Sequence, residues 1–444
     1  MPVNGKKIIW LIAAAVLARL IFSVLYSPLY FRDSRDYLEL AGMLRNWDFS
    51  GYTGARTPVY PLLILLSGGQ TGPLLIAQFF MGLAISLLLY LIFRNIFGGE
   101  KYGLLAGLGY ALNPSQLAFE RAVLAETLAT LLIAGSFLVF VRLLKNGASL
   151  RRCFFLGILS ALAVLTKPLY VFLPPLYAAL AAGCYFLRKD RNPRAAVRQF
   201  VGIIIPALIL LGGWSLFNYA KTGYLGVTTL GGFNLSNHTG AFIEDAPEKY
   251  GRIKGIYLKY RGDALESTGT ASQTIWLALD ELEKSTGLSF AQLSRQFGEM
   301  SLGLIAAHPG RYLASVARSA VIFWLPTWYA EKGGFLARIR SGGSAEKALL
   351  YCFGACHALC SLIFAGFLAS WLFSRKMRLT AGFNCLIFSI YSLVLANVVI
   401  QALLEYGENA RYKQPIEPFI IGLALCLVLT WWEKWGGRES LEFR

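Results

Sequence analysis

Charged residues are scarce in this chain. They make up 15% of its 444 residues, whereas soluble proteins carry about a quarter. Hydrophobic residues make up 56% and occur in long blocks, several of which exceed the ~18 residues that indicate a membrane-spanning helix. This composition excludes a soluble multi-domain protein and a disordered one, and it indicates a chain that crosses the lipid bilayer several times.

Cysteine is sparse as well. Seven cysteines are scattered in or beside apolar stretches, where a thiol behaves as a small hydrophobic group. Cys352, Cys356, His357 and Cys360 form a local cluster, but three residues separate the first two cysteines, and the c-type haem motif requires two. Helical spacing without polar neighbours favours packing on a helix face over metal binding for this cluster.

About ten apolar segments are expected to cross the membrane. They cover residues 8–27, 73–97, 102–118, 121–144, 153–168, 169–187, 199–220, 347–374, 379–402 and 412–432. Clusters of Lys and Arg occur in alternate connections, so all of them fall on one side of the membrane if the N-terminus is cytoplasmic. This orientation accounts for most of the formal net charge of +17, and a nucleic-acid partner becomes unnecessary.

The expected fold class is therefore an all-α polytopic membrane protein in three parts. These are a transmembrane module at 1–220 with a first outer loop at 28–72, a large outer loop at 221–346, and C-terminal transmembrane helices at 347–444. The localisation that follows is a multi-pass protein of a plasma or inner membrane, with its large loop on the outer face.

The large outer loop is expected to contain helices of its own. Residues 271–284 and 289–307 are predicted to form amphipathic helices, with Ser289 as the N-cap of the second. Residues 312–328 are predicted to be interfacial or re-entrant, because a crossing there would move the basic cluster at 375–378 to the outer side.

The first outer loop places carboxylates beside the membrane. Asp33 and Tyr37 are four residues apart, on one face of a short predicted helix that also carries Asp36. A carboxylate in an aromatic pocket just outside the bilayer is suited to general-base catalysis. The periodicity alone favours the simpler alternative, a solvated amphipathic helix beside the membrane.

Cations also lie where the outer loops meet the membrane. Arg56 precedes Thr57-Pro58, Lys167 precedes Pro168, and Arg411 stands just before the last span. Ionisable groups this close to hydrocarbon are costly unless they pair or face a water-filled cavity; for each one, snorkelling to the interface is the alternative. Carboxylates and cations together on one face suit a substrate with a phosphate, which Arg binds through its planar pair of donors.

Several different short motifs are distributed along nearly the whole chain. They are Asp33, Tyr37 and Ala41; Arg56-Thr57-Pro58-Val59-Tyr60-Pro61; Asn113-Pro114 followed by Glu126; Phe217-Asn218-Tyr219; Gly231-Gly232-Phe233-Asn234-Leu235; His308 to Leu313; and Glu408 to Pro415. In this order and topological placement they resemble the membrane glycosyltransferases of the GT-C fold, the group that includes protein O-mannosyltransferases and lipid A aminoarabinose transferases.

The resemblance implies a transferase that takes a sugar from a polyprenyl-phosphate carrier on the outer face. Its catalytic candidates are Asp33 as general base, Asp36 as the alternative base, and Glu126 as a residue that orients the acceptor or assists the base. Its candidates for stabilising the leaving phosphate are Arg56, Lys167 and Arg411. The other substrate-binding candidates are Tyr37, Tyr60, His238, Tyr412 and Lys413.

No cofactor is expected with certainty. The family often has an Asp-Glu pair in the first outer loop, whereas Ser34 follows Asp33 here, so a divalent metal is not supported by the sequence. The acceptor is a lipid, a glycan or a protein, and the sequence does not distinguish among them. The main alternative function is a transporter or flippase for a lipid-linked saccharide, although the chain lacks the internal symmetry and broken helices of transporters. A non-catalytic scaffold would not require the outer charges.

Overall fold

The computed structural model describes residues 5–147, 149–186, 193–268, 271–326, 343–373 and 385–435. Within these residues the regular elements are helices, and one isolated bridge joins Leu29 to Ala122. The all-α architecture predicted from the composition is therefore confirmed.

Seven helical segments of the described chain are long and apolar enough to cross a membrane. They are Gly5–Val24, Thr71–Phe97, Glu126–Asn146, Pro168–Tyr185, Pro193–Thr222, Cys352–Ser370 and Cys385–Leu404. They correspond to α1 (Gly5–Leu25), α4 (Thr71–Phe97), α7 (Glu126–Asn146), η1 (Pro168–Tyr170) with α9 (Leu173–Phe186), α10 (Pro193–Thr222), α17 (Gly343–Phe373) and α19 (Cys385–Leu404). The chain is a multi-pass membrane protein.

The three other predicted spans are also helical, but they are not among these seven segments. Two of them form α8 (Leu150–Thr166) and α21 (Glu417–Trp435). The predicted span at 102–118 instead forms two helices, α5 (Glu100–Ala111) and α6 (Pro114–Glu120). Pro114 disfavours helical geometry at the residue before it, and the Asn113 side chain caps α6 by accepting hydrogen bonds from the backbone N–H groups of Ser115 and Gln116.

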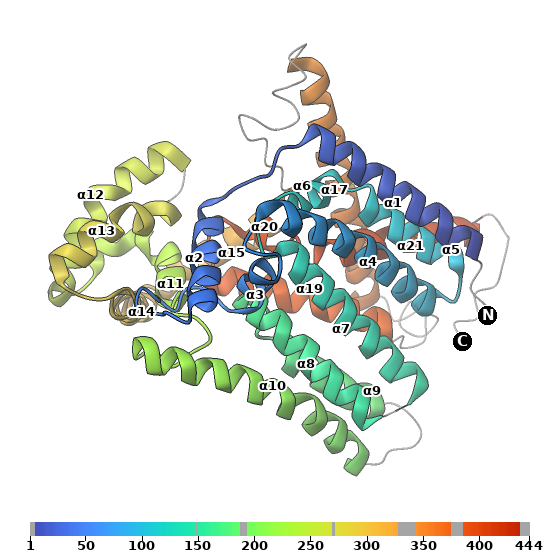
Figure 1. Ribbon diagram of the computed structural model, residues 1–444, viewed down its shortest axis with the longest axis horizontal. Coiled ribbons are helices and arrows are strands. Elements are labelled where there is room, and N and C mark those ends of the chain that lie inside the picture. The colour runs from blue at the N-terminus through green and yellow to red at the C-terminus, as the bar shows by residue number, and fades with distance from the viewer. Residues whose placement is uncertain are drawn as a thin grey trace.

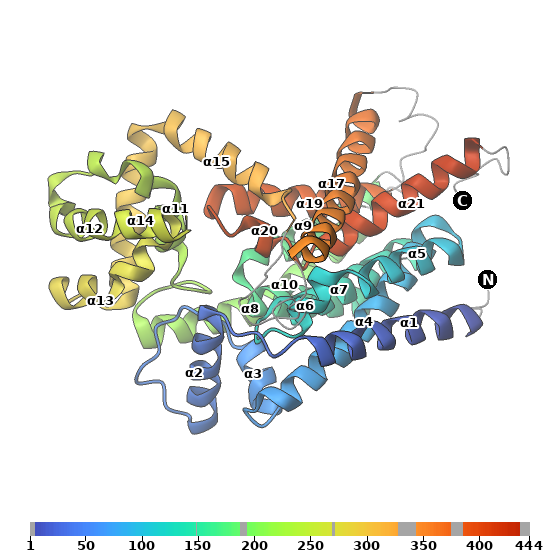
Figure 2. The same cartoon turned by 90° about the horizontal axis from the view of Figure 1, so that it is seen from above.

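The large loop forms a lobe of helices outside the bundle, at the left of Figure 1 and Figure 2. Its helices are α11 (Gly231–Thr239), α12 (Gly251–Thr268), α13 (Thr274–Thr286) and α14 (Phe290–Ala307). They pack around a separate apolar core that includes Phe233, Tyr257 and Phe297. Ser289 accepts a hydrogen bond from the backbone N–H of Gln292, so the predicted N-cap is confirmed.

The segment after this lobe is α15 (Pro309–Phe323). Its 15 residues extend over about 22 Å, which is less than the ~30 Å hydrocarbon core. Residues 327–328 of the segment predicted at 312–328, and the basic cluster at 375–378, lie outside the described residues, so the interfacial placement stays a prediction.

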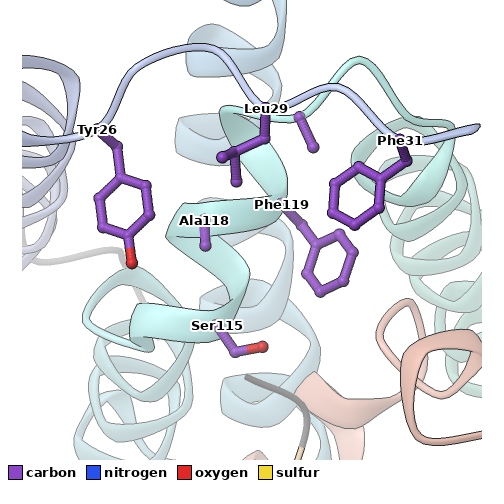
Figure 3. Close-up of a pocket in the computed structure, with 7 residues that line it drawn as sticks. Tyr26, Leu29, Phe31, Ser115, Ala118 and Phe119 are labelled. Atoms are coloured by element: carbon purple, nitrogen blue, oxygen red, sulfur yellow. The ribbon is translucent and has the colours of Figure 1, made fainter. Parts of the chain in front are cut away.

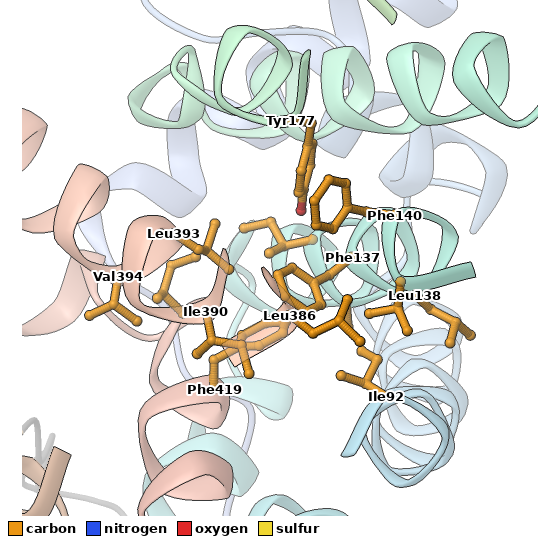
Figure 4. Packing of buried hydrophobic residues seen from close by; sticks show 14 of the residues in the cluster. Ile92, Phe137, Leu138, Phe140, Tyr177, Leu386, Ile390, Leu393, Val394 and Phe419 are labelled. Atoms are coloured by element: carbon orange, nitrogen blue, oxygen red, sulfur yellow. The ribbon is translucent and has the colours of Figure 1, made fainter. Parts of the chain in front are cut away.

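The largest apolar core lies within the membrane bundle, around α7. Figure 4 shows Phe137 and Phe140 from α7 facing Tyr177 from α9, Ile390 from α19 and Phe419 from α21. The rings of Phe137 and Phe419 meet edge to face, with 5.0 Å between their centroids. Helices distant in sequence therefore pack against α7, whose first residue is Glu126.

The basic connections meet at the end of the bundle away from the α11–α14 lobe. Lys7 lies 3.3 Å from Glu100, Lys101 pairs with Glu433 at 2.5 Å, and Lys145 donates to the backbone oxygen of Asn95. Figures 1 and 2 show the start of α1 and the end of α21 at this same end. The bundle therefore has a basic end and an opposite end that carries the lobe.

A buried ion pair ties α1 to α6. The Arg19 guanidinium donates to both carboxylate oxygens of Glu120 at 2.7 Å, and the Tyr110 hydroxyl donates to the same carboxylate at 2.8 Å. Gly82 allows this approach, because a Cβ there would lie 2.3 Å from a Glu120 oxygen. The two charged residues are 2% and 4% exposed, so each depends on the other for its counter-charge.

Glu120→Gln is expected to lower the free energy of unfolding by about 3–5 kcal/mol, because Arg19 would keep a buried charge without its partner. Unfolding of the detergent-solubilised protein by denaturant measures this loss. The matched control is Glu281→Gln, which breaks the exposed ion pair with Lys259 and should have little effect. Equal destabilisation by the two substitutions would contradict the role of the buried pair.

Candidate active site

A short backbone pairing fixes where the first outer loop begins its helix. Leu29 donates its N–H to the backbone oxygen of Arg121, and Val123 donates to the oxygen of Leu29, both at 2.9 Å. Figure 3 shows this segment passing over α6, with Leu29 and Phe31 above Ala118 and Phe119. The small void between them, about 10 Å³, has room for a water molecule at most.

The helix that follows is α2 (Arg32–Asn46). Ser34 closes its first turn, because its hydroxyl accepts the backbone N–H of Phe31 at 2.9 Å. The pairing of residues 29 and 121–123 thus brings Asp33, in the first turn of α2, beside Glu126, the first residue of α7. Ser34, directly after Asp33, therefore has a structural role in capping this helix.

Arg56 is positioned by a second pairing, between the first and the large outer loops. Thr229 donates its backbone N–H to the oxygen of Gly54 at 3.0 Å, and the Thr228 hydroxyl donates to the oxygen of Ala55 at 2.9 Å. Gly54 has a φ of +78°, and a Cβ there would lie 2.5 Å from a methyl carbon of Thr229. Glycine is therefore required for this close approach, which places Arg56 opposite α2.

Asp33 lies between two arginines. The Arg56 Nη2 donates to one carboxylate oxygen of Asp33 at 2.7 Å, and the Arg411 Nη2 donates to the other at 2.6 Å. Arg56 also binds Asp36, at 2.8 Å from its Nη2 and 3.0 Å from its Nε. Arg411 belongs to α20 (Asn409–Tyr412), so residues nearly 380 positions apart meet at one carboxylate.

Glu126 binds two of the cations, Lys167 and Arg411. Its Oε1 accepts from the Lys167 Nζ at 2.9 Å and from the Arg411 Nε at 3.0 Å. Glu126 is 1% exposed and does not line the cavity described below. Its ion pairs therefore fix the positions of Lys167 and Arg411.

Aromatic rings support the charged groups. The Arg56 guanidinium lies 5.1 Å from the ring centroid of Tyr37, and the Lys167 ammonium lies 4.4 Å from that of Tyr412. The Tyr60 ring meets Tyr37 edge to face at 4.9 Å. Cation–π contacts of this kind stabilise a desolvated cation.

A cavity of about 840 Å³ opens against these groups. One wall contains Asp33, Asp36, Tyr37, Arg56, Lys167, Arg411 and Tyr412. The other wall comes from the large loop and includes Asn234, Asn237, Gln273 and Trp276. The volume is within the range of small-molecule sites, and the lining combines charges on one side with amide and aromatic groups on the other.

The ion pairs determine the charge of the carboxylate at the centre. Burial by itself would raise the pKa of Asp33, but Arg56 and Arg411 outweigh it and hold that pKa well below its usual range. Burial raises the pKa of Tyr37 well above its usual value. Asp33 is therefore an anion at neutral pH, and Tyr37 is a neutral hydroxyl.

Three of the predicted substrate-binding residues lie away from the cavity lining. The Tyr60 hydroxyl donates to Gln78 at 2.9 Å behind Tyr37. His238 is buried in α11, with its Nδ1 2.8 Å from the Ser315 hydroxyl, and burial lowers its pKa to about 4. Lys413 is fully buried in a separate cluster, described next.

That separate cluster joins α17 to α21. The Lys413 Nζ lies 2.8 Å from His357 Nε2 and 3.5 Å from the Glu417 carboxylate. His357 Nδ1 lies 3.0 Å from the same carboxylate. Cys352 and Cys356 are exposed on α17, so the expectation that they share a packed face with His357 is wrong: the histidine turns inward to the charged pair, whereas these thiols turn outward.

The motifs did not assign several residues that line the cavity. Glu405 is 4% exposed, and its Oε1 accepts from the Asn237 amide at 2.9 Å. Arg32 donates to the Trp276 backbone oxygen at 3.1 Å and lies 4.9 Å from the indole centroid. An acidic residue directly after an apolar span was the available signal for Glu405; the contacts of Asn237, Arg32 and Trp276 depend on how the lobe docks.

A metal ion is not favoured by the groups at this site. Asp33 binds Arg56 and Arg411, and Asp36 binds Arg56, so both carboxylates already have guanidinium groups as counter-charges. Within the described residues, no group of three or more His, Cys, Asp or Glu side chains is arranged to hold a metal ion. The side chains described at this site therefore do not support a divalent metal.

The fold and the site together define a membrane protein with a polar cavity at one end of its helix bundle. Residues 58–230 match the model of a family described as dolichyl-phosphate-mannose-protein mannosyltransferase. This match confirms the resemblance to membrane glycosyltransferases that the motifs indicated. It includes Glu126 and Lys167, whereas Asp33, Arg56 and Arg411 lie outside it. No curated protein sequence matches the chain.

Solved structures of an archaeal oligosaccharyltransferase, AglB from Archaeoglobus fulgidus, are similar to the chain. The complex with an inhibitory peptide and a dolichol-phosphate is 15% identical, with a TM-score of 0.46, over 98% of this chain and 53% of that one. The apo form is 16% identical, with a TM-score of 0.43, over 99% and 52%. The chain spans about half the length of these structures.

The pH dependence of stability tests the environment of Glu405. Burial, reinforced by Glu408, raises the pKa of Glu405 from 4.5 to about 8. The folded protein thus retains a proton that the unfolded chain releases, so this group stabilises the fold fully below pH 4.5 and the contribution is lost as the pH rises through about 8. The melting temperature of the wild type should therefore fall more between pH 4.5 and about pH 8 than that of Glu405→Gln, whose amide does not titrate. Parallel pH profiles would contradict the buried carboxyl.

Proposed function

We propose that the protein is an integral membrane glycosyltransferase that moves a sugar from a polyprenyl-phosphate carrier to an acceptor on the outer face of the membrane. The observation that carries this proposal is the position of Asp33, held between Arg56 and Arg411 at the wall of a cavity of about 840 Å³. The family match over residues 58–230 supports it independently of these three residues.

Arg56 and Arg411 suit the phosphate of the donor. Each guanidinium presents planar donors that match a phosphate, and in the absence of a donor both bind the Asp33 carboxylate. An entering phosphate competes for these donors. Lys167 lines the same wall and adds a third positive charge, so the site can stabilise the negative charge that grows on the phosphate as it leaves.

The same competition activates Asp33. With the guanidinium groups turned to the phosphate, the Asp33 carboxylate loses the interactions that depress its pKa, and it becomes a stronger base. It then accepts the proton of the acceptor hydroxyl while that oxygen forms a bond to the anomeric carbon. The bond from the anomeric carbon to the phosphate oxygen breaks, and the polyprenyl phosphate leaves with the electron pair.

Other predicted residues have supporting roles in this proposal. Glu126 positions Lys167 and Arg411 through its Oε1. Tyr37 and Tyr412 line the cavity and place rings against Arg56 and Lys167. Asp36 shares Arg56 with Asp33 and is the alternative base. In this proposal Tyr60, His238 and Lys413 belong to the packing around the site, since their contacts lie away from the cavity lining.

The outer face is the side that best fits the charge distribution. The cavity is lined by residues at helix ends next to the α11–α14 lobe, whereas the connections with Lys7, Lys101 and Lys145 lie at the other end of the bundle. Basic connections favour the cytoplasmic side, so the lobe and the cavity belong on the opposite side.

The alternative of a transporter or flippase has less support. Transporter sites lie near the bilayer midplane and are formed by broken helices, whereas the residues that line this cavity lie at or beyond the ends of the candidate spans. The acceptor is a lipid, a glycan or a protein. Mannose is the first sugar to test, because the description of the matching family names it.

Asp33→Asn is expected to reduce transfer by at least about 100-fold, because the amide cannot accept the acceptor proton. Transfer is measured with polyprenyl-phosphate-mannose in membranes, together with mass analysis of envelope glycolipids and glycoproteins from cells with and without the protein. Glu39→Gln is the matched control, since Glu39 is a half-exposed carboxylate on the same helix paired with Arg35. Full activity of the Asp33 variant would move the base to Asp36 or refute the mechanism.

Arg411→Ala is expected to weaken donor binding about tenfold or more, because one phosphate partner is lost. Equilibrium binding of polyprenyl-phosphate-mannose to the purified protein measures this effect. Arg35→Ala removes an exposed arginine of α2 and serves as the control. Unchanged donor affinity in the Arg411 variant would remove its phosphate role.

A further inference from the structure

Glu405 is fixed at the junction between the membrane bundle and the lobe. It follows the last residue of α19, and its backbone N–H donates to Gln401 at 2.8 Å. Its backbone oxygen accepts from the Ser319 hydroxyl at 2.6 Å and from the Asn409 amide at 3.1 Å. Three contacts therefore hold this residue in place at the cavity wall.

Glu405 differs from the other acidic groups around the cavity. Asp33, Asp36 and Glu408 each lie within 4.0 Å of an arginine nitrogen. Among the described residues, no Lys, Arg or His nitrogen is paired with the Glu405 carboxyl, which instead accepts a hydrogen bond from the neutral amide of Asn237 at 2.9 Å. Its surroundings thus favour a neutral carboxyl, and burial raises its pKa to about 8.

A neutral carboxyl next to an amide is suited to a sugar. The protonated carboxyl can donate one hydrogen bond and accept others, and the amide likewise has donor and acceptor atoms. A neutral group is also compatible with a phosphate nearby, whereas a second unpaired carboxylate would repel it. Asn237 reaches this position from α11, so the pair forms only when the lobe is docked on the bundle.

The position along the chain relates Glu405 to the donor. Glu405 and Arg411 belong to the same short segment between α19 and α21, and Glu408 between them lies 3.6 Å from Arg411. Both residues line the same cavity. In the proposed function Arg411 binds the phosphate of the donor, and the sugar is bonded directly to that phosphate.

We propose that Glu405, held by Asn237, binds a hydroxyl group of the sugar on the polyprenyl-phosphate donor and thereby contributes to selection of the sugar. This inference rests on the proposed function. It adds a sugar-binding residue to a site whose other charged groups serve the phosphate and the proton transfer.

The test compares lipids that differ only in the sugar. Full-length wild-type protein, Glu405→Ala and Glu405→Gln are titrated in nanodiscs with three probes: polyprenyl-phosphate-mannose, polyprenyl-phosphate-glucose and polyprenyl phosphate without a sugar. The wild type should bind at least one sugar-bearing lipid about tenfold more tightly than the bare phosphate. Glu405→Ala should lose this preference while binding the bare phosphate as the wild type does, which also shows that the variant is folded.

The conservative variant separates recognition from structure. Glu405→Gln keeps a donor and an acceptor in the same place, so it should retain most of the preference for the sugar-bearing lipid. Glu39→Gln should behave as the wild type. An equal loss of affinity for all three lipids in Glu405→Ala would overturn the inference and assign Glu405 to the phosphate or to the fold.

Two further outcomes distinguish this inference from the proposed function. If wild-type protein binds the phosphate lipid but shows no preference for either sugar, or if Glu405→Ala keeps the preference and slows only transfer to the acceptor, the inference is wrong while the glycosyltransferase proposal stands. If the wild type binds none of the three lipids, the proposed function itself fails.

Discussion

The contact on which the site depends is the pair of guanidinium–carboxylate bonds that Asp33 makes with Arg56 and Arg411. Each residue comes from a separate part of the chain, and none of the three can be left alone at low exposure without a large desolvation cost. The ion pairs therefore hold three parts of the chain together: α2, the end of the first outer loop next to the large loop, and α20. The backbone holds one carboxylate and two cations together at the wall of one cavity.

Backbone hydrogen bonds hold these parts of the chain in place, and they require few specific side chains. The Leu29 bridge to Arg121 and Val123, and the approach of Gly54 to Thr229, each use backbone hydrogen bonds and leave the neighbouring side chains free for the cavity. Buried ion pairs elsewhere, such as Arg19 with Glu120, keep the bundle under these loops in one arrangement. The charges in the membrane part of this protein are thus divided between groups that orient helices and groups that face the cavity.

The sequence predicted the parts of the site that combine an ionisable residue with a membrane boundary. Asp33, Arg56, Lys167 and Arg411 are of this kind, and the structure places them around one cavity. The sequence analysis assigned Lys413 to the same site as Arg411 because both stand just before the last span, although residues two apart point in different directions on a helical turn. The burial of His238 and the contact of Glu405 with Asn237 depend on how the lobe packs on α15 and α19, which no local pattern encodes. Pro114 is itself a signal for a helix boundary. The apolar residues on both sides of it nevertheless led to the prediction of one continuous span at 102–118.

In the proposed mechanism, the resting ion pairs also have a protective consequence. Without a donor, Asp33 is bound on both oxygens, and its depressed pKa makes it a poor base toward water or a stray hydroxyl. A phosphate that takes over the guanidinium donors supplies the leaving group and releases the base in one exchange. A sugar without a phosphate cannot trigger that exchange, and a phosphate without the correct sugar leaves Glu405 and Asn237 unfilled. In this mechanism, base activation is coupled to donor binding because the two arginines share one carboxylate.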